Sequence, residues 1–132
     1  AKRRDTMHLI IGGAYQGKLD YAKTRFALSE SDIFTCSENT GKVDFHKKCV
    51  YRLEEYTLWC ARNQTDAVIA FQKQAGAWKN SILICGDIFC GVVPLGADLR
   101  AWREITGRLC AYLAQKADSV TRIFCGLEHK LK

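Results

Sequence analysis

The sequence predicts an α/β fold in which helices cover a mostly parallel sheet. Short apolar runs of strand length alternate with longer segments whose apolar residues recur at helical spacing. Parallel strands are joined by crossover connections that usually contain a helix, so this alternation is typical of a parallel sheet. The chain has 132 residues, which is enough for one hydrophobic core but not for two. We therefore expect residues 1–132 to form a single domain.

The first half of the chain contains two apolar runs of strand length and three segments of helical periodicity. In order, these are a strand over 7–11, a helix over 18–27, a strand over 32–36, a helix over 43–62 and a helix over 66–74. The first strand ends at Gly12 and Gly13, and the composition of 37–41 predicts a loop after the second strand. Asp66 stands at the start of the last helix, where its side chain would cap backbone N–H groups.

The second half supplies the clearest buried strand and the longest helix. Residues 81–85 are predicted to form a buried strand, apolar after Ser81, that stops at Gly86. Asp98 is expected to cap a long helix, and a strand over 120–125 is expected to close the sheet. The inner face of that helix consists of Leu99, Trp102, Thr106, Leu109, Leu113 and Ala117. In a sheet of this kind, ligands bind at the carboxyl ends of the strands.

The charge balance favours an anionic partner. Lys and Arg number 20 against 14 Asp and Glu, which gives a net charge of +6. Proteins that read RNA usually interleave exposed aromatic residues with basic ones. Here the basic residues are spread along the chain and the aromatic residues fall mostly at core spacings, so the sequence does not favour a nucleic acid. A basic nucleic-acid binder is kept as a third alternative.

The cysteines and the apolar runs bear on the compartment. There are seven cysteines, and an odd number excludes a fully paired disulfide framework. No secretory leader is recognisable, so we expect a reducing compartment and a cytoplasmic protein. The cysteine spacing is not that of a zinc site, and most of these residues are expected to be small core side chains. No apolar run approaches the roughly 20 residues of a membrane span.

A phosphate-binding motif follows the first strand. The seven residues of the pattern GxxxxGK are Gly12, Gly13, Ala14, Tyr15, Gln16, Gly17 and Lys18. Glycines let successive backbone N–H groups point at phosphate oxygens, and the start of the following helix adds partial positive charge. Lys18 would then meet the terminal phosphates of a nucleotide. The alternative is an ordinary glycine turn between a strand and a helix.

Two further positions concern Mg²⁺. Leu19 stands where this motif usually has Ser or Thr, whose hydroxyl binds the ion. The sequence therefore keeps the phosphate cradle and weakens the metal site. Asp87 directly follows the strand over 81–85, where a carboxylate can reach a metal ion or a ligand hydroxyl. The alternative for Asp87 is a turn residue that bonds nearby backbone N–H groups.

A wider set of residues at the two ends of the chain matches the pattern of one family. These residues are Gly12 and Gly13 near the start and Val93, Pro94, Trp102, Arg103, Glu104, Gly107, Arg108, Ala117, Asp118, Val120, Gly126, Leu131 and Lys132 towards the end. On them the chain resembles the adenosylcobinamide kinase/adenosylcobinamide-phosphate guanylyltransferase family of cobalamin biosynthesis. Residues 55–59 also resemble a family element in which an acidic residue ends an apolar strand, although charged residues, and no apolar strand, fill 47–55 here.

The resemblance implies a three-layer P-loop NTPase-like (RecA-like) domain that phosphorylates adenosylcobinamide or a related corrinoid with ATP or GTP and Mg²⁺. Lys18 and Asp87 would then be catalytic. Many members also transfer GMP from GTP through a histidine, and His46, which is followed by Lys47, is the candidate for that role. A homo-oligomer is implied as well. The alternative is a degenerate relative that binds a nucleotide or a corrinoid without turnover.

Overall fold

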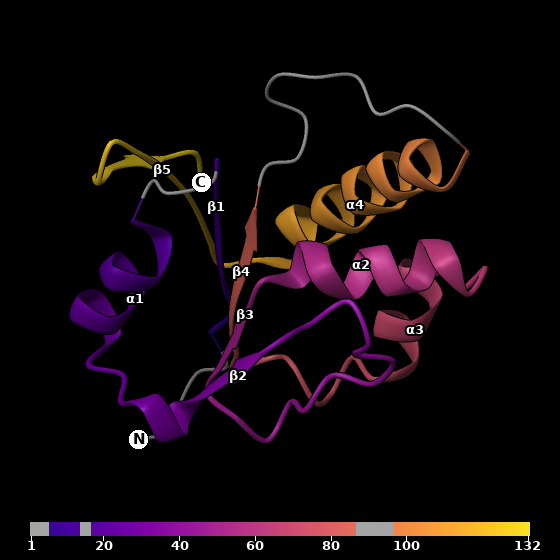
Figure 1. Cartoon of the computed structure of the whole chain (residues 1–132). Helices are drawn as coiled ribbons and strands as arrows, with labels where there is room; N and C mark the ends of the chain where they lie inside the picture. The colour runs from indigo at the N-terminus through magenta and orange to yellow at the C-terminus, as the bar shows by residue number, and fades with distance from the viewer. Residues whose placement is uncertain (1–5, 14–16, 87–96) are drawn as a thin grey trace.

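The computed structural model describes residues 6–13, 17–86 and 97–132, and these form a six-stranded sheet between two layers of helices (Figure 1). The strands are β1 (His8–Gly12), β2 (Ile33–Thr35), β3 (Cys49–Tyr51), β4 (Ile82–Gly86), β5 (Ser119–Phe124) and β6 (Leu127–Lys130). The helices are α1 (Lys18–Phe26), α2 (Leu53–Arg62), α3 (Ala67–Lys73) and α4 (Ala97–Lys116), with a 3₁₀ turn at Glu30–Asp32. Helix α1 covers one face of the sheet, and α2, α3 and α4 cover the other.

Strand β1 lies inside the sheet, whose order is β2-β3-β4-β1-β5-β6. The first five strands run parallel, and β6 runs antiparallel to β5. The connection after β1 leads to β2, on one side of β1 in the sheet. The connection after β4 leads to β5, on the other side of β1. Because parallel crossovers are right-handed, these two connections place α1 and α4 on opposite faces (Figure 1). Neighbouring strands whose connections diverge in this way open a ligand site at their carboxyl ends.

Alternate strand residues pack into two apolar clusters, one on each face. The cluster beneath α2, α3 and α4 includes Leu9, Val50, Leu83, Leu109 and Leu113. The cluster beneath α1 includes Ile10, Ala22, Ile82, Ile84 and Ile123. Strands that are apolar on both sides are typical of a parallel sheet covered by helices on both faces. The free thiols of Cys36, Cys49, Cys60 and Cys85 are buried among them, as the sequence predicted.

The helix predicted over 43–62 is wrong in its first half. Residues 49–51 form β3, which pairs with β2 on one side and β4 on the other, and α2 begins only at Leu53. Cys49 and Val50 are fully buried in the two opposite clusters, as successive residues of a strand must be. The helical spacing holds from Leu53 onwards, but a strand of three residues is too short to show a period of its own.

The remaining predicted strands, together with α1 and α3, agree with the structure to within one residue at each end. Asp66 caps α3 as predicted, because its carboxylate accepts the N–H groups of Val68 and Ile69. On α4, the predicted inner residues Thr106, Leu109, Leu113 and Ala117 are buried. This helix begins at Ala97, so Asp98 lies inside its first turn and is not the cap.

The sheet continues beyond the strand that was expected to close it. Strand β5 turns back at Cys125 and Gly126 into β6, and these two residues have φ angles of 52° and 76°. Two consecutive residues with positive φ are typical of the tight turn of a two-residue hairpin. Strand β6 is therefore the edge strand at this side of the sheet. In the parts of the chain that the structure describes, no helix combines the length and the apolar character that crossing a membrane requires.

Candidate functional site

The carboxyl ends of β1 and β4 lie side by side, because Gly12 pairs with Gly86 in the parallel register. At Gly12 a side chain would meet backbone, and at Gly86 it would displace the Glu54 carboxylate. A Cβ on Gly12 would lie 2.6 Å from the backbone oxygen of Ile123 in β5, and a Cβ on Gly86 would lie 2.7 Å from a carboxylate oxygen of Glu54. Contacts that short do not occur in folded proteins without a shift of the neighbouring atoms. The two glycines therefore let other groups approach the ends of the strands closely.

Lys18 is held at this edge by the turn between β1 and α1. Helix α1 begins directly after Gly17, whose φ of 87° and ψ of 23° lie in the left-handed region that glycine adopts without strain. The Lys18 side chain is only 8% exposed, and its Nζ donates a hydrogen bond to the backbone oxygen of Gly13 at 2.6 Å. The ammonium group is thus bent back across the loop, at the positive end of the helix.

Two features of this turn concern the bound anion that the sequence predicts. Gly17 is the N-cap of α1, and because it has no side chain, no N-cap side chain bonds the first-turn N–H groups. Leu19 is partly buried and packs against the apolar cluster beneath α1. The other three residues of the predicted loop, Ala14, Tyr15 and Gln16, lie outside the described residues, and so does Asp87.

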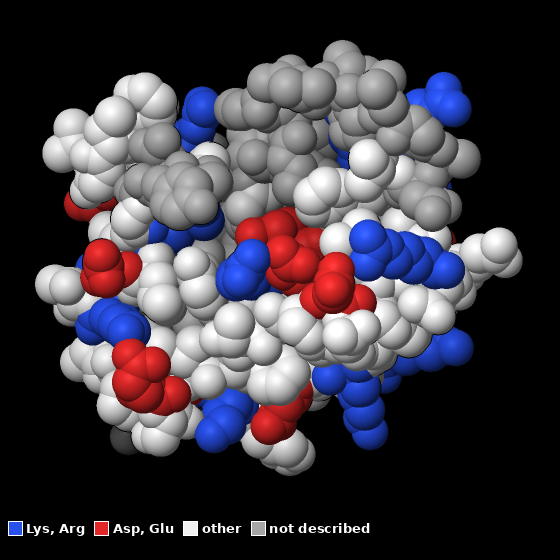
Figure 2. Space-filling model, in the orientation of Figure 1, with Lys and Arg blue, Asp and Glu red and all other residues white. Residues whose placement is uncertain are grey.

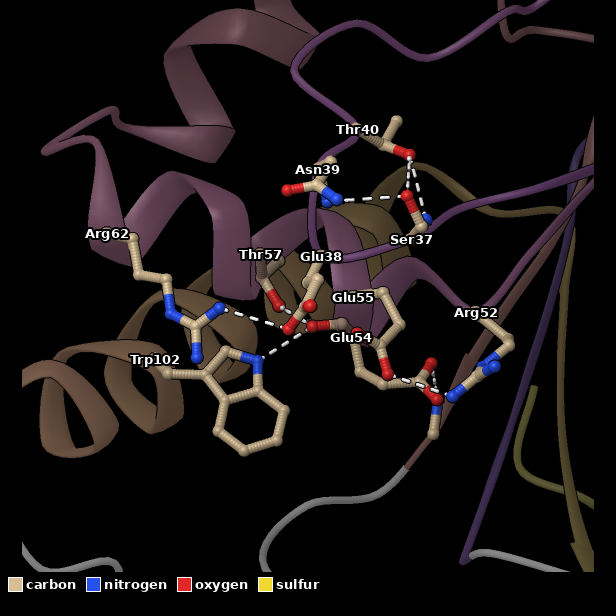
Figure 3. A network of polar contacts seen from close by, with 11 residues as sticks. Ser37, Glu38, Asn39, Thr40, Arg52, Glu54, Glu55, Thr57, Arg62 and Trp102 are labelled. Atoms are coloured by element: carbon tan, nitrogen blue, oxygen red, sulfur yellow. Dashed lines mark hydrogen bonds and ion pairs between the residues drawn. The ribbon is translucent and has the colours of Figure 1, made fainter.

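Glu54 is a site residue that the sequence did not single out. Its Oε1 accepts the backbone N–H of Gly86 at 2.8 Å, which brings the carboxylate to the carboxyl end of β4. Its backbone oxygen accepts the Nε1–H of Trp102 at 2.7 Å and the hydroxyl of Thr57 at 2.9 Å, so α4 and α2 both fix its position (Figure 3). Oε1 makes the bond to Gly86, and Oε2 is the carboxylate oxygen that this bond does not engage.

The signal for Glu54 is present in the sequence but depends on recognising β3. A carboxylate just after a short buried strand stands at the carboxyl edge of a parallel sheet. The apolar residues of β3 were included in a predicted helix, and the acidic residue assigned to the family element was Glu55. In the structure Glu55 forms an ion pair with Arg52 at 2.9 Å (Figure 3).

The charges of Lys18 and Glu54 both act on the thiol of Cys85, the residue before Gly86. The pKa of Cys85 is raised well above its usual value, first by the contact with the Cys110 thiol at 3.5 Å and then by burial. The negative charge of Glu54 raises the pKa further, and the positive charge of Lys18 opposes that rise. Cys85 is therefore a neutral thiol at pH 7, and Lys18 and Glu54 are close enough to share one electrostatic environment.

Acidic and basic groups alternate on the surface around the start of α2. Figure 2 shows Asp and Glu atoms gathered in the middle of this face, with Lys and Arg atoms on both sides. Beyond the pair formed by Glu55, Arg62 of α2 forms an ion pair with Glu38 at 3.1 Å (Figure 3). Among the described residues, no three His, Cys, Asp or Glu side chains come together to hold a metal ion.

His46 lies at the opposite edge of the sheet. It stands three residues before β3, and the register that pairs Cys49 with Ile82 and Ile82 with His8 marks the amino ends of the strands. The backbone N–H of His46 donates to the carboxylate of Asp44 at 3.0 Å. Its side chain lines an open hollow of about 540 Å³. The structure therefore brings Lys18 and Glu54 together and leaves His46 apart from them.

The arginines of α4 that carried the resemblance lie on the exposed side of that helix. Arg108 forms an ion pair with Glu104 one turn earlier, and both side chains are more than half exposed. Such a pair contributes little to stability or to a site. No protein-family model and no curated protein matches the chain. The function is therefore argued from the geometry at the ends of β1 and β4.

Proposed function

We propose that the chain binds a nucleoside triphosphate at the carboxyl ends of β1 and β4, with Lys18 against its phosphates. The observation that supports this proposal is the buried ammonium of Lys18, bent over a glycine turn at the start of α1. A triphosphate would place negative charge beside this ammonium, and the backbone N–H groups at the start of α1 would complete the cradle.

The proposed chemistry is transfer of the terminal phosphoryl group to a hydroxyl, and positioning and charge are what the protein contributes to such a step. Lys18 would stabilise negative charge on the phosphates. Glu54 would hold Mg²⁺ through Oε2, and a single carboxylate fits an ion that otherwise takes its ligands from phosphates and water. Bound there, Mg²⁺ would neutralise charge that develops on the transferred group. Asp87, next to Gly86 in the chain, is the proposed second carboxylate.

The acceptor we propose is adenosylcobinamide or a related corrinoid, which rests on the family resemblance. Under this proposal the kinase step takes place at Lys18 and Glu54. Transfer of GMP through His46 receives no support from the geometry, because His46 lies at the other edge of the sheet. The proposed activity is therefore the phosphorylation of a corrinoid hydroxyl.

The test is calorimetry with ATP, GTP and GDP, with and without Mg²⁺, followed by incubation with adenosylcobinamide. We expect nucleotide binding that strengthens with Mg²⁺, and a phosphorylated corrinoid that mass spectrometry detects. Absence of any nucleotide binding would overturn the whole proposal. Binding without a phosphorylated product, even at high protein concentration, would overturn the kinase activity and leave the nucleotide site.

A second candidate function is nucleotide or corrinoid binding without turnover, and the observation that favours it is Leu19. This partly buried side chain packs against the apolar cluster beneath α1 and offers no hydroxyl to Mg²⁺. The variant Leu19→Ser separates the two candidates. If the chain is a degenerate binder, the serine should strengthen Mg²⁺-dependent nucleotide affinity by several-fold. If Glu54 already holds the ion, the affinity should change little and the phosphorylated corrinoid should appear with the native chain.

A further inference from the structure

The outer edge of β6 carries an exposed surface that the proposed nucleotide site does not use. All four residues of β6 are exposed, and among the described strands only β5 pairs with it. Three of the four large apolar side chains that are exposed in the described residues lie on this hairpin and its tail. They are Phe124, Leu127 and Leu131, with exposed fractions of 61%, 72% and 52%. An exposed edge strand of this kind is a template for pairing with another strand.

The backbone of β6 offers its free groups at two positions. The N–H of Leu131 donates to the backbone oxygen of Val120 at 2.8 Å, so Leu131 faces β5. In an antiparallel pair, hydrogen-bonded and non-bonded positions alternate along the strand. The N–H and C=O groups of Leu127 and His129 therefore also face β5. Those of Glu128 and Lys130 point to the outer edge.

We propose that β6 pairs with β6 of a second copy of this chain, antiparallel and about a two-fold axis at His129. In this register the outward groups of Glu128 bond those of Lys130 of the other copy, twice by symmetry. The carboxylate and the ammonium then lie opposite each other in both pairs, and Leu127 lies opposite Leu131. Opposite charges and apolar side chains in directly facing positions stabilise an antiparallel pair.

The charges of Glu128 and Lys130 favour this register over the two adjacent registers. A shift in one direction places Glu128 opposite Glu128 of the second copy. A shift in the other direction places Lys130 opposite Lys130. Each shift brings one like-charged pair together and moves the leucines out of contact with each other, which is unfavourable. The second shift also places Glu128 opposite Lys132, but that ammonium is already bonded to the backbone oxygens of Ala114 and Gln115. The sequence Leu-Glu-His-Lys-Leu therefore matches its own antiparallel copy in one register.

The two kinds of contact fall on opposite faces of the extended sheet. Glu128 accepts the hydroxyl of Tyr21 at 2.7 Å, which places it and Lys130 on the side of α1. Leu127 and Leu131 alternate to the other side, where Phe124 is paired with Leu127. A single strand pair buries less surface than a standard stable interface. We therefore expect a weak, concentration-dependent dimer.

Charge reversal tests the register directly. Glu128→Lys places lysine opposite lysine, and Lys130→Glu places glutamate opposite glutamate, so each variant alone should dimerise about tenfold more weakly than the native chain. An equimolar mixture of the two variants should dimerise as well as the native chain, because both facing pairs are then opposite in charge. Sedimentation equilibrium at about pH 8 measures all three.

The control is Lys73→Glu, which makes the same charge change on exposed α3 and should leave the dimer unchanged. A crosslink gives an independent readout. In a Cys125→Ser background, His129→Cys should form a disulfide between two copies, and Leu127→Cys, which does not face itself, should not. Three results overturn the proposal: a native chain that is monomeric up to about 1 mM, a dimer that neither reversal weakens, or a mixture that stays monomeric.

Discussion

The edge of the sheet formed by the carboxyl ends of the strands and the edge formed by their amino ends hold different kinds of group. At the carboxyl edge, the ammonium of Lys18 and the carboxylate of Glu54 are fixed by backbone groups of Gly13 and Gly86. At the amino edge, the hollow of about 540 Å³ is lined by groups that include Val43, Phe45 and His46. The site proposed above therefore does not coincide with the hollow at the amino edge.

The groups at the two edges also contribute differently to the stability of the fold. Around the amino edge, the rings of Phe45 and Phe71 meet edge to face at 5.2 Å, and the indole of Trp78 donates to the backbone oxygen of Phe71 at 2.8 Å. Such contacts add aromatic burial and a satisfied polar group, both of which stabilise the fold. At the carboxyl edge, keeping the charged side chain of Lys18 out of water costs stability. A cost of that kind is typical of a functional site.

The largest expected effect is that of Lys18→Ala at the carboxyl edge. Removing the ammonium should weaken nucleotide binding about 100-fold, since a charge-assisted contact to a phosphate is among the strong hydrogen bonds. Calorimetry with ATP and Mg²⁺ measures the loss, and thermal unfolding checks the fold. The matched control at the amino edge is Lys47→Ala, whose ammonium bonds the backbone oxygen of Ser31. Equal losses in both variants would contradict the assignment of the site to the carboxyl edge.

Glu54→Gln should have the next largest effect, and only in the presence of Mg²⁺. The amide oxygen of glutamine can still accept the N–H of Gly86, so the fold is kept while the negative charge is lost. We expect nucleotide affinity with Mg²⁺ to fall about tenfold, and affinity without Mg²⁺ to stay unchanged. Glu55→Gln, one residue further along α2, is the control. A loss that is the same with and without the ion would assign Glu54 a purely structural role.

The two edges also differ in how far the sequence predicted them. The strand before Gly12 and the strand before Gly86 are long apolar runs, and their parallel pairing brings the predicted loop and the position before Asp87 together. Glu54 could not be found in the same way, because β3 is only three residues long and lies next to a helix whose periodicity extends over it. The hairpin turn at Cys125 was missed because a cysteine is not a usual turn residue.

A third, smaller effect concerns pH and lies at the amino edge. The pKa of His8 is lowered from 6.5, mainly by burial and also by the positive charge of Arg25, against an opposing contribution from Asp118. The unfolded chain therefore binds the proton more readily, and stability is lost as the pH falls from about 6.5 towards the lowered pKa. His8→Gln should flatten that part of the profile by less than about 1 kcal/mol, because solvent screens a half-exposed ring.

Denaturant unfolding at several pH values measures this contribution. The His8 imidazole contacts the hydroxyl of Ser119 and packs on the ring of Phe26, and glutamine can keep a hydrogen bond to that hydroxyl. Above pH 7 the native chain and the variant should therefore show the same dependence on pH. A steeper loss of stability in the variant below pH 6.5 would contradict the direction of the pKa shift.

The smallest effect should be that of His46→Ala, which tests whether the amino edge takes part in nucleotide binding. Because His46 lies at the amino edge, its removal should change nucleotide affinity at the carboxyl edge by less than about twofold.

The family resemblance separately implies that a histidine accepts GMP, as it does in many members. Incubation with GTP labelled at the α-phosphate, followed by denaturation, reveals such an adduct. A label that the native chain acquires and His46→Ala loses would establish a second nucleotide centre at the amino edge, and the hollow there would then be a site in its own right. If neither protein acquires a label while Lys18→Ala loses ATP binding, nucleotide chemistry belongs to the carboxyl edge alone.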